Sequence, residues 1–143
     1  MTMQTDLDRP LRILVADDDE TLRTLLAAVL ASDGHQTALV ADGAELLERL
    51  ARGLLEGSGW PFDLIVSDVN MPMWSGLDLL AGLRRDPHAP PVILMTAFPD
   101  ERTQREARRL GAVTLLDKPF DLDELRTLVR RLAQAVPGGP PLS

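Results

Sequence analysis

Five polar or charged side chains stand at the ends of apolar stretches of the chain, and their types suit metal binding or group transfer. Asp17 and Asp18 follow one predicted strand, Asp68 follows a second, Thr96 ends a third, and Lys118 follows a fourth. The carboxyl ends of parallel strands meet at one edge of an open α/β sheet, where ligands bind. Three carboxylates, a hydroxyl and an ammonium are therefore expected to lie together at that edge.

The chemistry open to these side chains follows from the repulsion between their carboxylates, which raises the pKa of each. The Lys118 ammonium offsets part of this repulsion, and a hard divalent cation offsets more. Carboxylate oxygens are ligands that Mg²⁺ prefers, and Mg²⁺ held by few carboxylates keeps positions open for phosphate oxygens. A carboxylate such as Asp68 can attack a phosphoryl group and form an aspartyl phosphate. Because phosphoryl transfer needs mainly alignment and charge neutralisation, the residues predict a phosphoryl-accepting site.

The elements that must position these side chains alternate along the chain between strand and helix. The periodicity of apolar residues and the local composition predict strands over 11–16, 35–40, 62–67, 91–97 and 113–116. Helices are predicted over 20–32, 43–55, 77–85, 100–110 and 122–135. Strict alternation predicts an α/β fold, a doubly wound parallel sheet with helices on both faces. The stretch 35–40 is only half apolar, which favours a place at the edge of the sheet.

Composition excludes several other classes of protein. The chain has 143 residues, no Cys and two His, which rules out a disulfide scaffold and a thiolate zinc site. Its net charge of −7 makes direct nucleic-acid binding a poor fit, since that requires clustered Lys and Arg. No apolar run approaches the roughly 18 residues of a membrane span. The N-terminus carries two Asp where a signal peptide is apolar, so a cytoplasmic location is expected.

One domain is expected at this length, with a short segment on either side of it. Residues 1–10 are polar and end in Pro, which predicts a flexible N-terminal segment. Residues 137–143, PGGPPLS, cannot continue a helix and predict a flexible tail or the start of a linker. The folded domain is therefore placed at 11–136. A stand-alone protein and a fragment of a longer regulator both remain open.

Short motifs in this order resemble the receiver domain of two-component response regulators. They are LVADD at 14–18, VSDVNMP at 66–72, Gly76, TA at 96–97, and KPF at 118–120. The resemblance covers about 11–136. It implies a flavodoxin-like fold, in which five parallel strands in the order 2-1-3-4-5 are accompanied by five helices.

The resemblance also implies a role for each acidic residue of the site. Asp68 would be the phosphoacceptor. Mg²⁺ would be held by the Asp18 and Asp68 side chains and by the backbone carbonyl of Asn70, while Asp17 orients metal-bound water.

A second set of residues is implied to sense the phosphoryl group. Thr96 resembles the switch hydroxyl that moves toward the phosphoryl group, and Lys118 resembles its salt-bridge partner. Ala97 and Pro119 would neighbour the phosphoryl site, and the Lys118–Pro119 bond resembles the cis peptide of the family. Leu115 departs from the pattern, because many receivers carry Tyr or Phe three residues before the Lys. The aromatic half of the usual switch is therefore not expected here.

The predicted function is a signalling switch rather than an enzyme with external turnover. A histidine kinase or phosphotransfer protein would donate the phosphoryl group to Asp68, and partner binding would change on the face made by 100–110, 113–116 and 122–135. That partner would be a second copy or a downstream protein. The alternative is an interaction module that keeps the fold without phosphorylation. A metal-dependent phosphohydrolase is disfavoured, because such enzymes usually carry a second Asp where this chain has Asn70.

Overall fold

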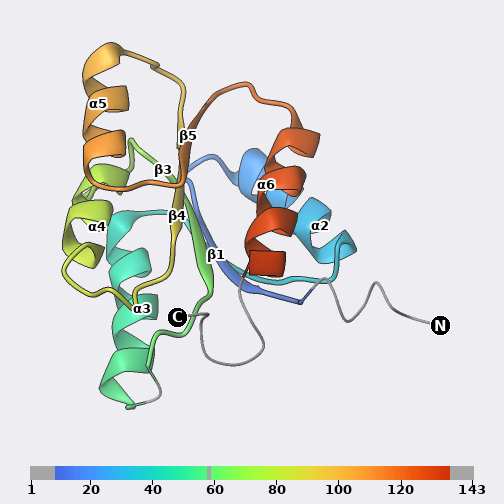
Figure 1. The fold of residues 1–143 in the computed structure, drawn as a ribbon, viewed down its shortest axis with the longest axis vertical. Helices are drawn as coiled ribbons and strands as arrows, with labels where there is room; N and C mark the ends of the chain where they lie inside the picture. The colour runs from blue at the N-terminus through green and yellow to red at the C-terminus, as the bar shows by residue number, and fades with distance from the viewer. Residues whose placement is uncertain (1–8, 58, 136–143) are drawn as a thin grey trace.

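The computed structural model describes residues 9–57 and 59–135, and these form a five-stranded parallel sheet between two layers of helices (Figure 1). The strands are β1 (Arg12–Ala16), β2 (Gln36–Val40), β3 (Leu64–Asp68), β4 (Val92–Thr96) and β5 (Thr114–Asp117). The helices are α2 (Glu20–Ser32), α3 (Gly43–Leu55), α4 (Gly76–Leu83), α5 (Glu101–Arg109) and α6 (Leu122–Ala135). The predicted tail at 137–143 and residues 1–8 of the predicted N-terminal segment lie outside the described residues.

The strand order is β2-β1-β3-β4-β5, and every neighbouring pair is parallel. α2 and α6 cover one face of the sheet, while α3, α4 and α5 cover the other (Figure 1). The predicted fold class and order are thus confirmed. So is the edge position of the half-apolar strand β2, which pairs only with β1 among the described strands.

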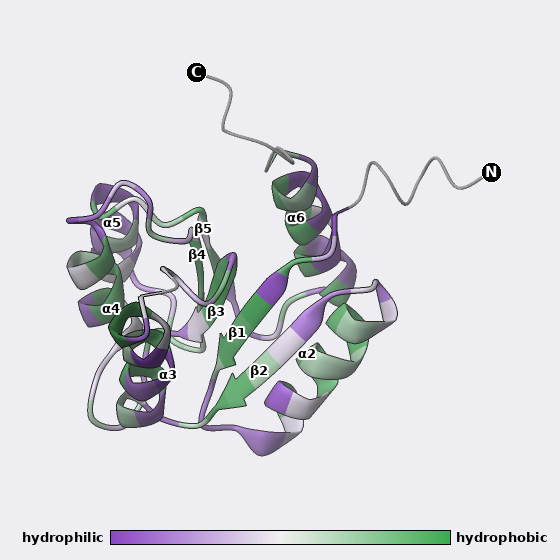
Figure 2. Ribbon diagram, turned by 90° about the horizontal axis from the view of Figure 1, so that it is seen from below, coloured by the Kyte–Doolittle hydropathy of each residue, from purple (hydrophilic) through white to green (hydrophobic). Residues whose placement is uncertain are grey.

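The core lies on both faces of the sheet because the central strands are apolar on both sides. Side chains alternate along β1, so that Leu14 packs in the cluster with α3 and α4, while Ile13 and Val15 pack in the cluster with α2 and α6. Figure 2 shows the hydrophobic colour concentrated on the strands, while the helices carry both colours. Full burial of one such side chain contributes about 1.5–3 kcal/mol.

Helix ends are fixed by local side-chain contacts. The Asp19 carboxylate accepts hydrogen bonds from the first turn of α2, and Ser75 and Asp78 form a reciprocal capping box at the start of α4. α2 ends before Gly34, which adopts φ +94°, a conformation that suits glycine. The Asp19 carboxylate therefore caps a helix beside the predicted site. Across residues 9–57 and 59–135, no helix has the length and apolar character needed to cross a membrane.

Candidate functional site

The predicted site residues come from four neighbouring strands whose carboxyl ends are aligned. Asp17 follows β1, Asp68 ends β3, Thr96 ends β4 and Lys118 follows β5. Parallel pairing keeps these ends level, with Asp68 beside Met95 of β4. The sheet therefore places four side chains that are distant in sequence at one edge, as the sequence predicts.

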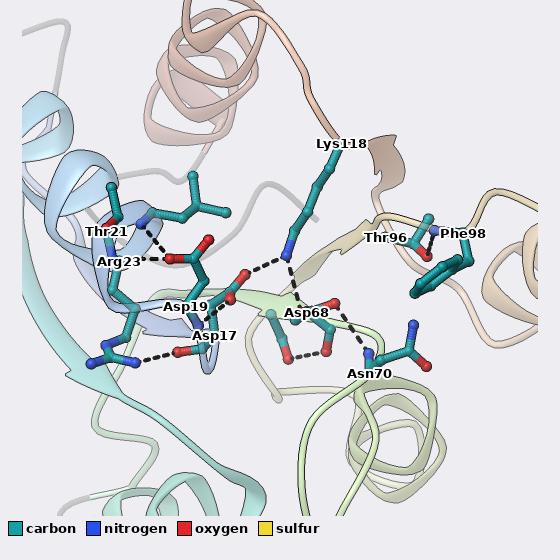
Figure 3. A network of polar contacts seen from close by, with 11 residues as sticks. Asp17, Asp19, Thr21, Arg23, Asp68, Asn70, Thr96, Phe98 and Lys118 are labelled. Carbon is teal, nitrogen blue, oxygen red and sulfur yellow. Dashed lines mark hydrogen bonds and ion pairs between the residues drawn. The ribbon is translucent and has the colours of Figure 1, made fainter.

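Lys118 connects two of the carboxylates directly (Figure 3). Its Nζ donates to Asp17 Oδ2 at 2.7 Å and to Asp68 Oδ2 at 3.0 Å. The other oxygens are held by the backbone: the Asp19 N–H donates to Asp17 Oδ1 at 2.8 Å, and the Asn70 N–H donates to Asp68 Oδ1 at 3.1 Å. Asp17 is fully buried and Asp68 is 5% exposed, so both carboxylates are fixed within the protein.

The pair of carboxylates carries more charge than the single ammonium neutralises. Burial is the largest influence on Asp68 and raises its pKa, an effect that hydrogen bonds from Lys118 and Asn70 only partly offset. Burial alone would lower the pKa of Lys118, but hydrogen bonds to Asp17 and Asp68 outweigh it, and the pKa is raised. Lys118 is therefore firmly cationic. The excess negative charge of the site rests on Asp68, whose charged form burial disfavours.

A third carboxylate, Asp18, completes an acidic cluster. Asp17, Asp18 and Asp68 each offer an oxygen, and these oxygens all lie within 4.8 Å of one another. Asp18 is exposed whereas the other two are buried, so the cluster is open to solvent on one side. Three carboxylates with excess negative charge fit a hard divalent cation such as Mg²⁺. Asn70 is exposed beside the cluster, and the role of its carbonyl as a ligand stays a prediction.

Thr96 lies on the strand next to Asp68, and its backbone carbonyl accepts a hydrogen bond of 2.7 Å from the Lys118 N–H, but its side chain has a different partner. It is 1% exposed, and its Oγ1 accepts a hydrogen bond of 3.0 Å from the Phe98 N–H (Figure 3). That bond ties the hydroxyl to the loop that leads into α5. Phe98 itself is 71% exposed.

The remaining predicted residues line two cavities, one of which also includes Lys118. Leu115 is half-buried, pairs with Leu94 and lines a cavity of about 340 Å³ between α5 and β5. Ala97 and Pro119 line a separate cavity of about 570 Å³ beside Lys118. The Lys118–Pro119 peptide is cis, as the resemblance implies.

Two hydrogen bonds and one close approach that were not predicted from the sequence support the acidic residues. The Arg23 guanidinium donates to the Asp17 backbone carbonyl at 2.7 Å, and the buried Ser67 hydroxyl donates to the Asp68 carbonyl at 3.0 Å. A Cβ on Gly76 would lie 2.6 Å from the same Asp68 carbonyl oxygen, so only glycine permits this approach. The sequence offered two signals, the polar Ser67 within the apolar run before Asp68 and Gly76 among the motif residues. Nothing in the sequence marks Arg23.

The sequence pattern that defines the response regulator receiver domain matches residues 13–130, inside the predicted range 11–136. The chain belongs to this family. Receiver domains act as phosphorylation switches of two-component systems and generally bind Mg²⁺ at a cluster of acidic residues. The acidic cluster of this receiver domain agrees with both properties.

The curated relatives that the receiver domain matches are longer regulators. It is 40% identical over 119 residues to the DNA-binding transcriptional regulator NtrC of Escherichia coli, covering 83% of this chain and 24% of NtrC. It is 39% identical over 135 residues to Protein PetR of Rhodobacter capsulatus, covering 92% of this chain and 54% of PetR. The receiver domain thus spans about a quarter to a half of these relatives.

Among solved structures, the receiver domain is similar to the signal receiver domain of a signal transduction histidine kinase from Syntrophus aciditrophicus. The TM-score is 0.75 at 30% identity, covering 93% of this chain and 97% of that one. The fold is therefore shared over nearly the whole of both chains.

Proposed function

We propose that Asp68 accepts a phosphoryl group from a phosphohistidine of a histidine kinase or phosphotransfer protein. The observation that carries this proposal is the sharing of the Lys118 ammonium between two buried carboxylates, Asp17 and Asp68, with Asp18 beside them. Asp68 is the member of the cluster that ends a central strand and has nearly full burial. It therefore has a fixed orientation, which favours its role as nucleophile.

In the transfer step, a carboxylate oxygen of Asp68 forms a bond to phosphorus while the bond from phosphorus to the imidazole nitrogen breaks. The nitrogen keeps the electron pair, and the donor leaves as an imidazole. The Lys118 ammonium neutralises charge on the phosphoryl oxygens, and the Asn70 N–H holds the other carboxylate oxygen in place. Mg²⁺ bound by Asp18, Asp68 and the Asn70 carbonyl would supply further neutralisation at those oxygens. Asp17 would orient water on the metal.

The donor is proposed to approach over the first turns of α2. The cavity beside Lys118 is lined there by Leu22 and Leu25, and on the other side by Phe120 and Leu122. Leu25 is 44% exposed, so an apolar surface adjoins the ammonium that faces the acceptor. A donor that packs an apolar helix on this surface would bring its phosphohistidine to the strand ends.

The output is proposed to begin at Thr96. Its hydroxyl would leave the Phe98 N–H and turn toward the phosphoryl group, which would favour a second arrangement of the loop before α5. Partner binding would then change on the face made by α5, β5 and α6, where a second copy or a downstream protein docks. Leu115 supplies no aromatic ring on that face, so the loop rather than a ring flip would carry the change.

Phosphorylation from a small acyl phosphate tests the proposal. Incubation with acetyl phosphate and Mg²⁺ should add the mass of one phosphoryl group, and Asp68→Ala should abolish the gain. Asp63→Asn is the matched control, because Asp63 pairs with Arg12 at the opposite end of the same strand. A wild-type chain that gains no mass would support the phosphorylation-independent module, for which the missing aromatic at Leu115 leaves room. We infer no turnover of external substrate, since the acceptor is the protein itself.

A further inference from the structure

The outer face of α3 exposes leucines that no described element covers. Leu46 and Leu50 point into the core and are buried, as an amphipathic helix requires. Leu47 is 45% exposed, Leu54 is 43% exposed and Leu55 is 86% exposed. The helix therefore has a second apolar surface that faces away from the sheet.

This second surface borders a groove between α3 and α4. The groove has a volume of about 230 Å³, and Leu47 and Leu54 form its α3 side. Trp60 and Trp74 contribute the large aromatic surfaces, and Gly82 contributes no side chain on the α4 side. A Cβ at Gly82 would meet no atom within 4 Å, so the groove has room for a side chain from outside.

We propose that a second copy of this chain occupies the groove, with the two α3 helices antiparallel about a two-fold axis near Ala51. Leu47 stands four residues before Ala51 and Leu54 three residues after it. An antiparallel pair centred there places Leu47 of each chain opposite Leu54 of the partner subunit. Ala51 at the crossing point is exposed and small, which lets the two helices approach closely.

Charge complementarity favours a second copy over an unrelated helix. Glu48 and Arg52 flank the apolar stripe and pair within one helix at 3.3 Å, with both side chains more than half exposed. In the antiparallel arrangement Glu48 also faces Arg52 of the partner subunit, and the symmetry repeats this contact. An isologous interface must be self-complementary in this way. Opposite charges beside an apolar stripe on one helix meet that condition.

The pairing is proposed to be independent of phosphorylation. α3 and α4 lie side by side, while the face proposed for output is formed by α5, β5 and α6 (Figures 1 and 2). A dimer through α3 would leave that face and the Asp68 edge accessible. Asp68→Asn should therefore dimerise as the wild type does, which separates this inference from the proposed function.

Sedimentation of the whole unphosphorylated chain over a concentration series tests the pairing. We expect a monomer–dimer equilibrium whose dissociation constant rises about tenfold or more in Leu47→Glu and in Leu54→Glu. Leu25→Glu on α2 is the matched control, since Leu25 is 44% exposed and lies outside the groove. A wild-type chain that stays monomeric throughout the series overturns the proposal, as does a control that weakens the dimer equally.

A charge exchange tests the register of the two helices. Glu48→Arg alone and Arg52→Glu alone should each weaken self-association, because each places like charges opposite one another. An equimolar mixture of these two variants should pair more tightly than either does alone, since every cross-contact in the mixed dimer is complementary. A mixture that associates no better than the single variants overturns the antiparallel arrangement, and circular dichroism of each variant checks that α3 remains helical.

Discussion

Replacing Lys118 with Met should destabilise the fold strongly at neutral pH. Within the described residues, Lys118 is the one basic side chain that forms a salt bridge with Asp17 or Asp68, at 2.7 and 3.0 Å. Met fills the same space as the apolar stem of Lys. The substitution therefore removes the ammonium with little change in packing and leaves two buried carboxylates without the positive charge that partly neutralises them.

The size of the effect follows from this burial. Removal of one partner from a buried ion pair costs about 3–5 kcal/mol. The Lys118 side chain keeps 18% of its surface exposed, which weakens the pair. We therefore expect a loss of about 2–3 kcal/mol in the free energy of unfolding at neutral pH. That is a large fraction of the roughly 5–15 kcal/mol by which a typical domain is stable.

Urea unfolding in metal-free buffer at several pH values measures the loss. Burial already raises the pKa of Asp68, and the variant lacks the Lys118 hydrogen bond that lowers it. A carboxyl group whose pKa is raised by folding contributes stability below its unfolded pKa and loses that contribution as the pH rises through its folded pKa. The deficit of the variant should therefore be greatest at neutral pH and should shrink as the pH falls toward about 4.

A double variant provides the control. Asp68→Asn removes one of the two charges, so Lys118→Met should cost less in that background than in the wild type, and the difference gives the coupling energy. A Lys118→Met protein that is as stable as the wild type at neutral pH would refute the reasoning. A deficit that stays constant with pH would refute it as well, because it would then arise from packing.

Three further expectations concern the same edge of the sheet. Gly76→Ala should cost about 1–3 kcal/mol in urea unfolding through its clash with the Asp68 carbonyl, whereas Gly82→Ala, in open space, should be neutral or stabilising by up to about 1 kcal/mol. Asp68→Asn should raise the melting temperature in metal-free buffer at neutral pH, and the gain should vanish below about pH 4, where the wild-type carboxyl is protonated too. Mg²⁺ at about 100 times its dissociation constant should stabilise the wild type by about 2.7 kcal/mol in thermal unfolding. Asp18→Ala should need more Mg²⁺ for the same gain while folding normally, since Asp18 is exposed.

Much of the fold could be predicted because its signals are local. Apolar runs mark the central strands, and glycines with positive φ mark the ends of helices, so the predicted bounds agree with the observed ones to within two residues. The differences have local causes. β3 begins at Leu64 rather than at the predicted residue 62, and Asp63 just before it bonds Arg12 both through its backbone N–H and through its carboxylate. α4 begins at Gly76, one residue earlier than predicted, because the capping box of Ser75 and Asp78 sets its start. The helix ends at Leu83.

The site was predictable in its members but not in its contacts. Position at strand ends predicts that Asp17, Asp68 and Lys118 lie together, since parallel strands share an edge. The division of one ammonium between two carboxylates depends on side-chain geometry, as does the support that Arg23 gives to the Asp17 carbonyl. Neither of these two contacts produces a periodic pattern in the sequence. Prediction of the strand order likewise required the resemblance to a known family. The alternation of strands and helices determines the class of fold but does not determine which strands are neighbours in the sheet.

The hydrogen bond between Thr96 and Phe98 has a consequence for the backbone that leads into α5. The Phe98 amide has its acceptor only while the Thr96 side chain keeps one χ1 rotamer, and a β-branched side chain has few alternatives. Rotation about a single bond at the buried end of β4 therefore removes the side-chain acceptor of a main-chain donor two residues further along. Val at this position would keep the shape of Thr but deprive that amide of its acceptor permanently, whereas Ser would preserve the bond with greater rotational freedom.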